Sequence, residues 1–257
     1  MMKINITPLG TVSPYPKGNM NCPGFLAEYN GHKILLDCGN GITSLMKMPD
    51  DLQKLHIIVT HYHKDHFGDL GALQYASFAY HNLRLLKEQI KIYLPENDFA
   101  NNKKSIICNK ESFAEYFYVS NNFSFNINDL KISFYDNKSH TIETFMVKLE
   151  TTDFKIVYTS DLGTTNFEKA VEFCKNSDLI ICESSFLKKH NSQSKTHLTA
   201  FDAGLLALKS EAKKLVLTHF WPEEDKMLYL EEAKTVFQNC ELAEEGKTQE
   251  GLPNYHH

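Results

Sequence analysis

Two kinds of hydrophobic pattern alternate along the chain. Short runs rich in β-branched residues predict strands at 33–36, 55–59, 130–134, 155–158, 179–181 and 215–217. Stretches with hydrophobic residues three and four positions apart predict helices at 70–86, 167–173, 199–208 and 228–237. Because strands and helices alternate over much of the chain, while the middle at about 105–160 is mainly strand-like, we expect an α/β protein with mixed sheets.

The chain carries no obvious division into domains. It has no long linker rich in proline, glycine or serine, and the polar stretches at 97–104 and 188–195 have the length of ordinary loops. We therefore expect one domain over residues 1–245. Residues 246–257 are expected to form a polar C-terminal tail.

Composition narrows the class of protein. The 257 residues are 42% hydrophobic and 23% charged, with a formal net charge of -5 at pH 7. Because an acidic chain does not attract polyanions over its whole surface, a long nucleic acid is not an expected partner. No run reaches the roughly 18 apolar residues of a membrane span, and the start of the chain lacks the apolar core of a secretory signal, so we expect a cytoplasmic protein without membrane contact.

A dense group of histidines follows the predicted strand at 55–59. The residues from Thr60 to His66 are THYHKDH, and Gly68 and a predicted helix come next. At a turn from strand to helix, two histidines two positions apart can converge on one point while the next aspartate and histidine face a second point nearby. Imidazole suits zinc and other borderline metals, and a carboxylate adds negative charge. Since this spacing arises by chance in about one chain in a thousand of this length, the segment predicts a metal site rather than a polar turn.

Three more residues lie at comparable places in the predicted elements. His140 follows the strand that ends near Tyr135, Asp161 closes the strand at 155–158, and His219 closes the strand at 215–217. Taken singly, each fits an ordinary role, such as a loop histidine or a turn cap. Their positions at strand ends become informative because a metal site is already expected nearby.

These segments, in this order along the chain, resemble the motifs of the metallo-β-lactamase superfamily. The segments LDCGNG at 36–41, CESSF at 182–186, THLTA at 196–200 and LTHF at 217–220 are similar to those of its ribonuclease Z and cyclic-phosphodiesterase branch. The resemblance covers nearly the whole chain. It implies a four-layer αββα sandwich of two mixed β-sheets, with a dinuclear metal site at one edge.

The resemblance also implies roles for individual residues. One metal is expected on His61, His63 and His140, the other on Asp65, His66 and His219, with Asp161 bridging the two. Asp37 matches a carboxylate that orients a ligating imidazole. Glu183 and His197 match a pair that assists proton transfer, so these two and Asp65 are the expected catalytic residues.

The expected ligands indicate the metal and the reaction. Two divalent ions are expected, zinc from the imidazole-rich set or manganese because Asp65 and Asp161 contribute carboxylates. Such ions lower the pKa of a bridging water, so that hydroxide can attack phosphorus or a carbonyl near neutral pH. His197, oriented by Glu183, is expected to protonate the leaving alkoxide. The sequence thus predicts a metal-dependent hydrolase, and more specifically a phosphodiesterase acting on small or cyclic phosphodiesters.

Other activities of the same fold are alternatives. Thioesterases and lactonases share the HxHxDH motif and the bridging aspartate, and only the resemblance at Glu183 and His197 speaks against them. True β-lactamases usually carry cysteine at the position of Asp161, and diiron flavoproteins typically carry glutamate at the position of His63. Both differences count against these two activities. A non-catalytic metal-binding protein is disfavoured because all seven expected ligand positions are kept.

A transfer-RNA-processing endonuclease is a further alternative. Ribonuclease Z grips transfer RNA with an inserted arm, whereas only 20 residues lie between His140 and Asp161, and Glu183 follows Asp161 by 22 positions, which leaves no room for an arm. The family's proline-rich final motif is also altered, with Trp221 and Pro222 directly after Phe220, and this change bears on the identity of the substrate. Since family members often form dimers, a homodimer is an alternative to a monomer.

Overall fold

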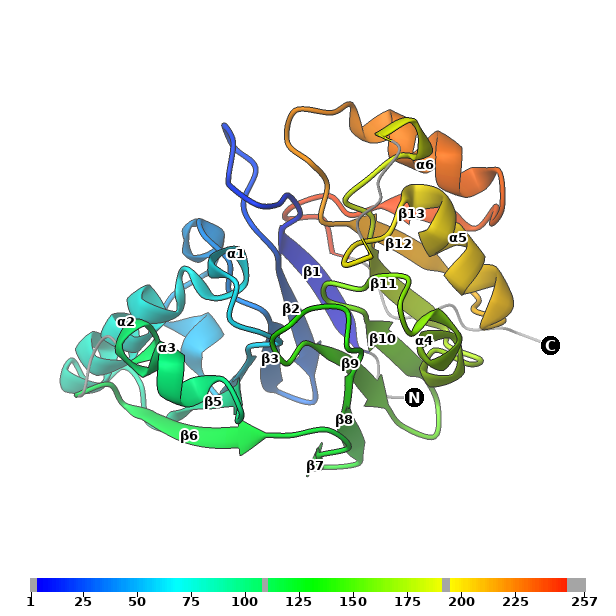
Figure 1. Ribbon diagram of the computed structural model, residues 1–257. Coiled ribbons are helices and arrows are strands. Elements are labelled where there is room, and N and C mark those ends of the chain that lie inside the picture. Colours follow the sequence, from blue (N-terminus) through cyan, green and yellow to red (C-terminus); the bar gives the residue numbers. More distant parts are fainter. Residues whose placement is uncertain (1–3, 108–110, 191–194, 249–257) are drawn as a thin grey trace.

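The computed structural model describes residues 4–107, 111–190 and 195–248. The strands in this part of the chain form two sheets that lie face to face (Figure 1). The first sheet has the order β1 (Asn5–Gly10), β2 (Gly24–Tyr29), β3 (His32–Leu36), β4 (Leu55–Ile58), β5 (Ile90–Pro95), β6 (Ala114–Val119). The second has the order β13 (Cys240–Leu242), β12 (Leu215–Thr218), β11 (Leu179–Glu183), β10 (Lys155–Tyr158), β9 (Phe145–Glu150), β8 (Leu130–Asp136), β7 (Ser124–Ile127). Both sheets are mixed, because each combines antiparallel and parallel pairs.

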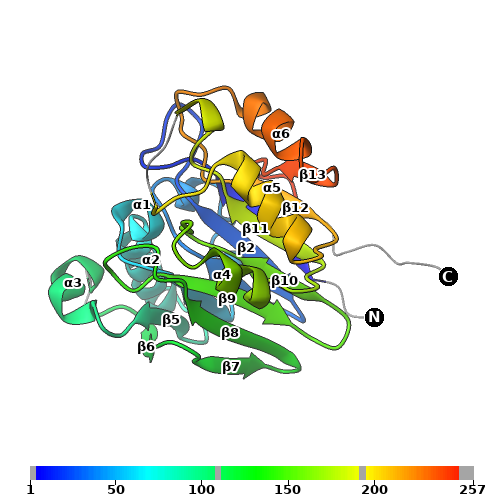
Figure 2. The ribbon, with the colours of Figure 1, turned by 45° about the vertical axis from the view of Figure 1, so that its right-hand side comes forward.

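Helices cover the outer face of each sheet (Figures 1 and 2). The first sheet carries α1 (Lys64–Phe67), α2 (Leu70–Asn82) and α3 (Phe99–Ile106). The second carries α4 (Phe167–Phe173), α5 (Ala200–Lys209) and α6 (Lys226–Lys234). Three short 3₁₀ turns complete the described elements: η1 (Ile42–Ser44), η2 (Asp50–Leu52) and η3 (Lys188–His190).

Three hydrophobic clusters separate these four layers. One lies between the sheets, and each of the other two lies between a sheet and its helices. Consecutive strand residues point to opposite faces, so Ile58 packs between the sheets while Ile57 packs under the helices, and Ile181 and Ile180 divide in the same way. Burial on both faces explains why these strands are continuous hydrophobic runs. The predicted four-layer αββα sandwich is confirmed.

All the strands and helices predicted from the pattern are present, with shifted ends. The loop predicted at 97–104 is wrong, because most of that stretch is the helix α3. Its only buried residue is Ile106, whose carbonyl accepts a hydrogen bond from Gln74 on α2. The two residues before α3 are hydrogen-bonded to Glu143. The backbone N–H of Glu143 donates to Asp98, and its carboxylate accepts from Asn97. These contacts come from distant segments, so local polarity gave no sign of them.

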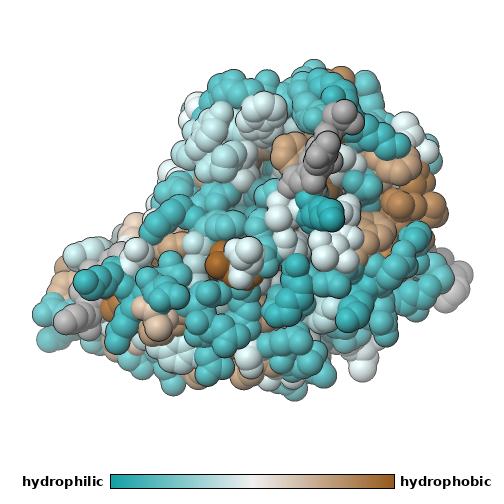
Figure 3. Space-filling view, in the orientation of Figure 1, coloured by the Kyte–Doolittle hydropathy of each residue, from teal (hydrophilic) through white to brown (hydrophobic). Residues whose placement is uncertain are grey.

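The two polar segments expected near the end of the chain are described only in part. Residues 191–194 of the stretch at 188–195, and residues 249–257 of the expected tail at 246–257, lie outside the described residues. The N–H of Gly246 donates to the carbonyl of Pro8, and the hydroxyls of Thr248 and Thr7 are 2.8 Å apart. Among the helices described, none has the length and hydrophobicity to span a membrane. The face in Figure 3 is mainly hydrophilic, with hydrophobic areas that include one near α5 and α6.

The strand directions bring distant parts of the sequence to one edge of the sandwich. The strands β3 and β4 run parallel in the first sheet, as do β10, β11 and β12 in the second. Because parallel strands end at the same edge, the residues that follow them are neighbours in space. Asp37, His61, Asp161 and His219 all follow such strand ends, and Glu183 is the last residue of β11.

Candidate metal centre

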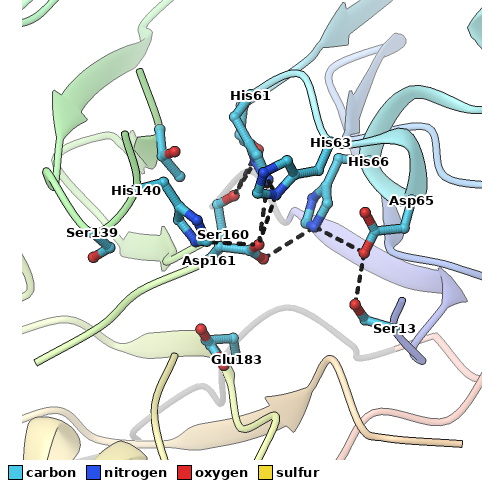
Figure 4. Close-up of polar contacts among 12 residues, drawn as sticks. Ser13, His61, His63, Asp65, His66, Ser139, His140, Ser160, Asp161 and Glu183 are labelled. Atoms are coloured by element: carbon cyan, nitrogen blue, oxygen red, sulfur yellow. Dashed lines mark hydrogen bonds and ion pairs between the residues drawn. The ribbon is translucent and has the colours of Figure 1, made fainter. Parts of the chain in front are cut away.

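Asp161 lies at the centre of a group of histidines (Figure 4). Its Oδ2 atom is 3.3 Å from Nε2 of His61, 3.7 Å from Nδ1 of His63 and 3.6 Å from Nε2 of His140. The first two histidines follow β4 of one sheet, while His140 follows β8 of the other. One carboxylate oxygen therefore faces the three residues expected to hold the first metal.

The other oxygen of Asp161 faces a second group. Its Oδ1 atom is 3.0 Å from Nε2 of His66 and 2.9 Å from Nε2 of His219. Oδ2 of Asp65 is 3.7 Å from each of these two nitrogens. The structure thus brings all seven expected ligands together, divided between the two oxygens of Asp161 as the bridging arrangement requires.

Hydrogen bonds fix the rings of three of these histidines. Nδ1 of His66 donates to Asp37 at 2.7 Å, and Nδ1 of His219 donates to the hydroxyl of Ser185 at 2.8 Å. Nδ1 of His61 lies 3.2 Å from the hydroxyl of Thr60. Because Nδ1 donates in these contacts, Nε2 is the nitrogen that faces the centre, and it can bind a metal once its own proton is released.

The Asp65 carboxylate is held by a loop far away in the sequence. The hydroxyl of Ser13 donates to its Oδ2 atom at 2.6 Å (Figure 4). The backbone N–H of Ser13 donates to the carbonyl of Phe220, and the N–H of Phe220 donates to Thr11. The loop before β2 is therefore bonded to the residue that follows His219, so both sheets support the same carboxylate.

The carboxylates of the centre favour the binding of cations. Burial alone would raise the pKa of Asp161, but the surrounding His219, His66 and His61 outweigh burial and hold that pKa well below its usual value. Burial likewise opposes the charge of His219, yet Asp161 and Asp65 raise its pKa to about 10. Without a metal, the carboxylates thus keep protons on the histidines. A divalent cation can replace these protons, because metal binding releases protons from its ligands.

Two further observations fit a metal. Burial lowers the pKa of His61 to about 4 and that of His140 to about 3, so both rings are neutral and able to donate a lone pair. In the described part of the chain, Nε2 of His140 and Oδ1 of Asp161 are buried without a hydrogen bond of good geometry, although Oδ1 lies close to Nε2 of His66 and His219. Buried polar atoms rarely lack a partner, and here a cation would provide one. The residues present therefore fit a site for divalent metal ions.

A carboxylate–imidazole pair stands beside the cluster. Nδ1 of His197 lies 2.8 Å from Oε1 of Glu183, and the His197 ring centroid is 5.1 Å from that of His140 and 5.5 Å from that of His219. Burial acts to lower the pKa of His197, but the charge of Glu183 and its hydrogen bond raise it overall. Both carboxylate oxygens of Glu183 accept hydrogen bonds from the backbone, because the N–H of Leu162 donates to Oε1 and the N–H of Ser185 donates to Oε2.

Sequence reasoning missed the hydroxyl groups of the site. Ser185 donates to Glu183 at 2.7 Å while it accepts from His219, and Ser160 lies 2.6 Å from the hydroxyl of Thr60. Ser160 and Thr60 directly precede an expected ligand, and Ser185 lies within the CESSF segment. Their proximity was therefore visible in the sequence, but hydroxyl residues are too common in turns for their roles to be recognised.

Comparison with known proteins agrees with this geometry. A family model described as a beta-lactamase superfamily domain matches residues 32–220. The probable metallo-hydrolase YhfI of Bacillus subtilis is 26% identical over 96% of this chain and 100% of its own length. Its crystal structure, described as a metallo-β-lactamase fold protein, superposes with a TM-score of 0.87 over 97% of this chain and 100% of YhfI.

Two further relatives carry names that refer to RNA. Ribonuclease Z of Clostridioides difficile is 28% identical over 94% of this chain and 96% of its own length. The structure of the short form of human tRNase Z, 23% identical, covers 97% of this chain and 99% of its own with a TM-score of 0.73, which shows a shared fold. The resemblance seen in the sequence is thereby confirmed. The chain belongs to the metallo-β-lactamase superfamily and is a metal-dependent hydrolase related to ribonuclease Z.

Proposed function

We propose that the protein is a phosphodiesterase that hydrolyses small or cyclic phosphodiesters at a dinuclear centre. The observation that carries this proposal is the His197–Glu183 pair at the edge of the histidine cluster. A phosphodiester releases an alkoxide, which is a poor leaving group unless it is protonated as the bond breaks. An imidazole beside the ligands is placed to supply that proton. A thioester does not need one, because a thiolate leaves readily.

We assign His61, His63 and His140 to one metal and Asp65, His66 and His219 to the other, with Asp161 bridging. Five imidazoles favour zinc, and the two carboxylates make manganese the alternative. When bound, such ions supply Lewis acidity and an activated water. Asp37, Ser185 and Thr60 hold the histidine rings in their metal-binding orientation.

Proton transfer is the task of the chain's own residues. Nδ1–H of His197 is held by Oε1 of Glu183, which leaves Nε2 as the atom that gives its proton to the departing oxygen. The negative charge of Glu183 stabilises the protonated imidazole before transfer. After the bond to phosphorus breaks, the proton stays on the alcohol and His197 is neutral.

The size of the chain supports a small substrate. The alignment with the Clostridioides difficile ribonuclease Z spans 297 positions, more than the 257 residues of this chain, so that enzyme contains segments absent here. A net charge of -5 does not favour a long polyanion. We therefore propose a small or cyclic diester as substrate rather than transfer RNA.

A substrate panel tests the proposal. Metal-loaded protein should hydrolyse bis(p-nitrophenyl) phosphate and 2′,3′-cyclic nucleotides, and the His66→Ala variant should lose this activity. Activity confined to a parallel set of thioesters and lactones would replace the proposal with a carbonyl hydrolase. The metal content of each preparation should be measured, so that loss of metal and loss of chemistry are separated.

Removal of the proton donor is a sharper test. We expect His197→Ala to keep its metals and to lose about 100-fold or more in turnover of diesters with alkoxide leaving groups, but far less with p-nitrophenolate. His81→Ala, a histidine at the far end of α2, serves as the control. Equal losses on good and poor leaving groups would show that His197 is not the proton donor.

A further inference from the structure

Trp221 is the only tryptophan of the chain, and 40% of its surface is exposed. It follows His219 by two positions, and two residues of chain span at most about 7 Å. Its backbone therefore lies within about 7 Å of that of His219, one of the residues expected to bind metal. We propose that Trp221, with His190 and Phe186, forms a stacking subsite for the nucleobase of the substrate. This inference rests on the proposed function and names the class of diester as one that carries a nucleoside.

A series of rings connects the proton donor to Trp221. The ring centroid of Phe186 is 6.1 Å from that of His197, and the centroid of His190 is 6.2 Å from that of Phe186. His190 is in turn 5.7 Å from Trp221. All three pairs are edge-to-face, with interplanar angles of 75–78°. A series of ring contacts through two partly buried side chains thus connects the site of proton transfer to the exposed indole.

The exposed indole is carried by a firmly held turn. The N–H of Glu224 donates to the carbonyl of Trp221, and Lys17 contacts both the Pro222 carbonyl and Glu223. Tyr15 also donates to Glu223. In Figures 1 and 2 the segment after β12 runs beside the loop between β1 and β2. Because these contacts hold the backbone that carries it, the exposed indole can bind a planar group at low entropic cost.

The neighbouring ring is fixed as well. Nδ1 of His190 accepts from the backbone N–H of Leu187, and its Nε2 atom lies 3.0 Å from Glu224. Both ring nitrogens are therefore occupied within the protein, and the ring offers only its faces and edges to a ligand.

The local charges favour an uncharged planar group. Glu224 is paired with Lys189 at 2.8 Å, and Glu223 is paired with Lys17. Because these charges compensate one another, the turn does not attract a second phosphate. A base stacks on an aromatic side chain whatever its sequence identity, and removal of such a contact weakens binding about tenfold or more. Among the alcohols that are esterified to phosphate, a nucleoside carries such a planar, uncharged group in its base.

Tryptophan fluorescence tests the subsite directly, because Trp221 is the only tryptophan and all tryptophan emission comes from it. Uridine 5′-monophosphate added to metal-loaded protein should quench the emission with saturation, whereas inorganic phosphate should not. Tyr75→Ala, an exposed aromatic on α2, should behave as the wild type. Equal quenching by phosphate and by the nucleotide, or no quenching by either, would overturn the proposal.

Steady-state kinetics with two esters provide a second test of the subsite. Thymidine 5′-(p-nitrophenyl phosphate) and methyl p-nitrophenyl phosphate share a leaving group and differ in the nucleoside. The ratio of their kcat/KM values should fall about tenfold in Trp221→Ala and recover in Trp221→Phe. An unchanged ratio would overturn the subsite, as would a dimer that dissociates in Trp221→Ala, since the indole would then be a subunit contact. If neither ester is hydrolysed, the proposed function fails, and the fluorescence titration still decides the subsite.

Discussion

At the scale of single residues, Ser185 connects the two halves of the site. Its hydroxyl donates to Oε2 of Glu183 at 2.7 Å and accepts from Nδ1 of His219 at 2.8 Å. The same glutamate holds His197 through its other oxygen. Ser185 therefore orients the expected metal ligand His219 and also holds the Glu183 carboxylate that positions the proposed proton donor.

We expect Ser185→Ala to weaken the binding of one of the two metals by about tenfold or more, because groups that orient ligands typically contribute this much. Competition with a chromophoric chelator measures the two affinities separately. Ser185→Thr, which keeps the hydroxyl, should restore most of the loss. Ser184→Ala is the matched control, since that buried hydroxyl donates only to the Thr218 carbonyl among its described contacts. Equal effects of the two alanine variants would contradict a specific role for Ser185.

At the scale of the elements, the site is built where strands end and the chain turns sharply. Asp37, Ser160 and His219 follow β3, β10 and β12 with φ angles of 60°, 52° and 64°. Such left-handed conformations cost free energy in residues other than glycine and are frequent at functional sites. The sequence predicted these strand ends and the residues after them. It could not predict the turn geometry or the hydroxyl contacts, which depend on how the two sheets face each other.

Strand β4 also carries a buried histidine that has no part in the site. His56 is 5% exposed, and burial lowers its pKa to about 4, with further lowering by Lys91 and His32. It pairs with Lys91 on β5, stacks with Tyr93 and Phe125, and lies 3.3 Å from the Tyr93 hydroxyl. Because the unfolded chain binds a proton at this histidine near pH 6.5 and the folded chain only near pH 4, stability falls as the pH is lowered between these values.

His56→Phe removes this titration and keeps an aromatic ring in the stack. Between pH 7 and pH 5, the free energy of unfolding should fall by about 2 kcal/mol less in the variant than in the wild type. Urea denaturation at the two pH values measures this difference, and titration of the metal-site histidines cancels because both proteins share them. Parallel losses in the two proteins would show that His56 does not hold a lowered pKa.

At the scale of the whole molecule, the alternating pattern and the family resemblance together anticipated the four layers. The hydrophobic runs located the strands, while the order of the motifs implied the sandwich. The pattern missed α3, because its hydrophobic contacts are few and its support comes from Gln74 and Glu143. The metal cluster was foreseen because His61 to His66 lie together in the sequence. Its division between the two oxygens of Asp161 became visible only in three dimensions.

The central claim is that two divalent ions at this cluster enable phosphodiester hydrolysis. Metal-free protein should be titrated with zinc, and in parallel with manganese, while the hydrolysis of bis(p-nitrophenyl) phosphate and the bound metal are measured together. The account predicts no activity without metal, full activity only near two ions per chain, and fewer than two bound ions in inactive Asp161→Ala. Hydrolysis by metal-free protein, or two bound ions without phosphodiester hydrolysis, would contradict it.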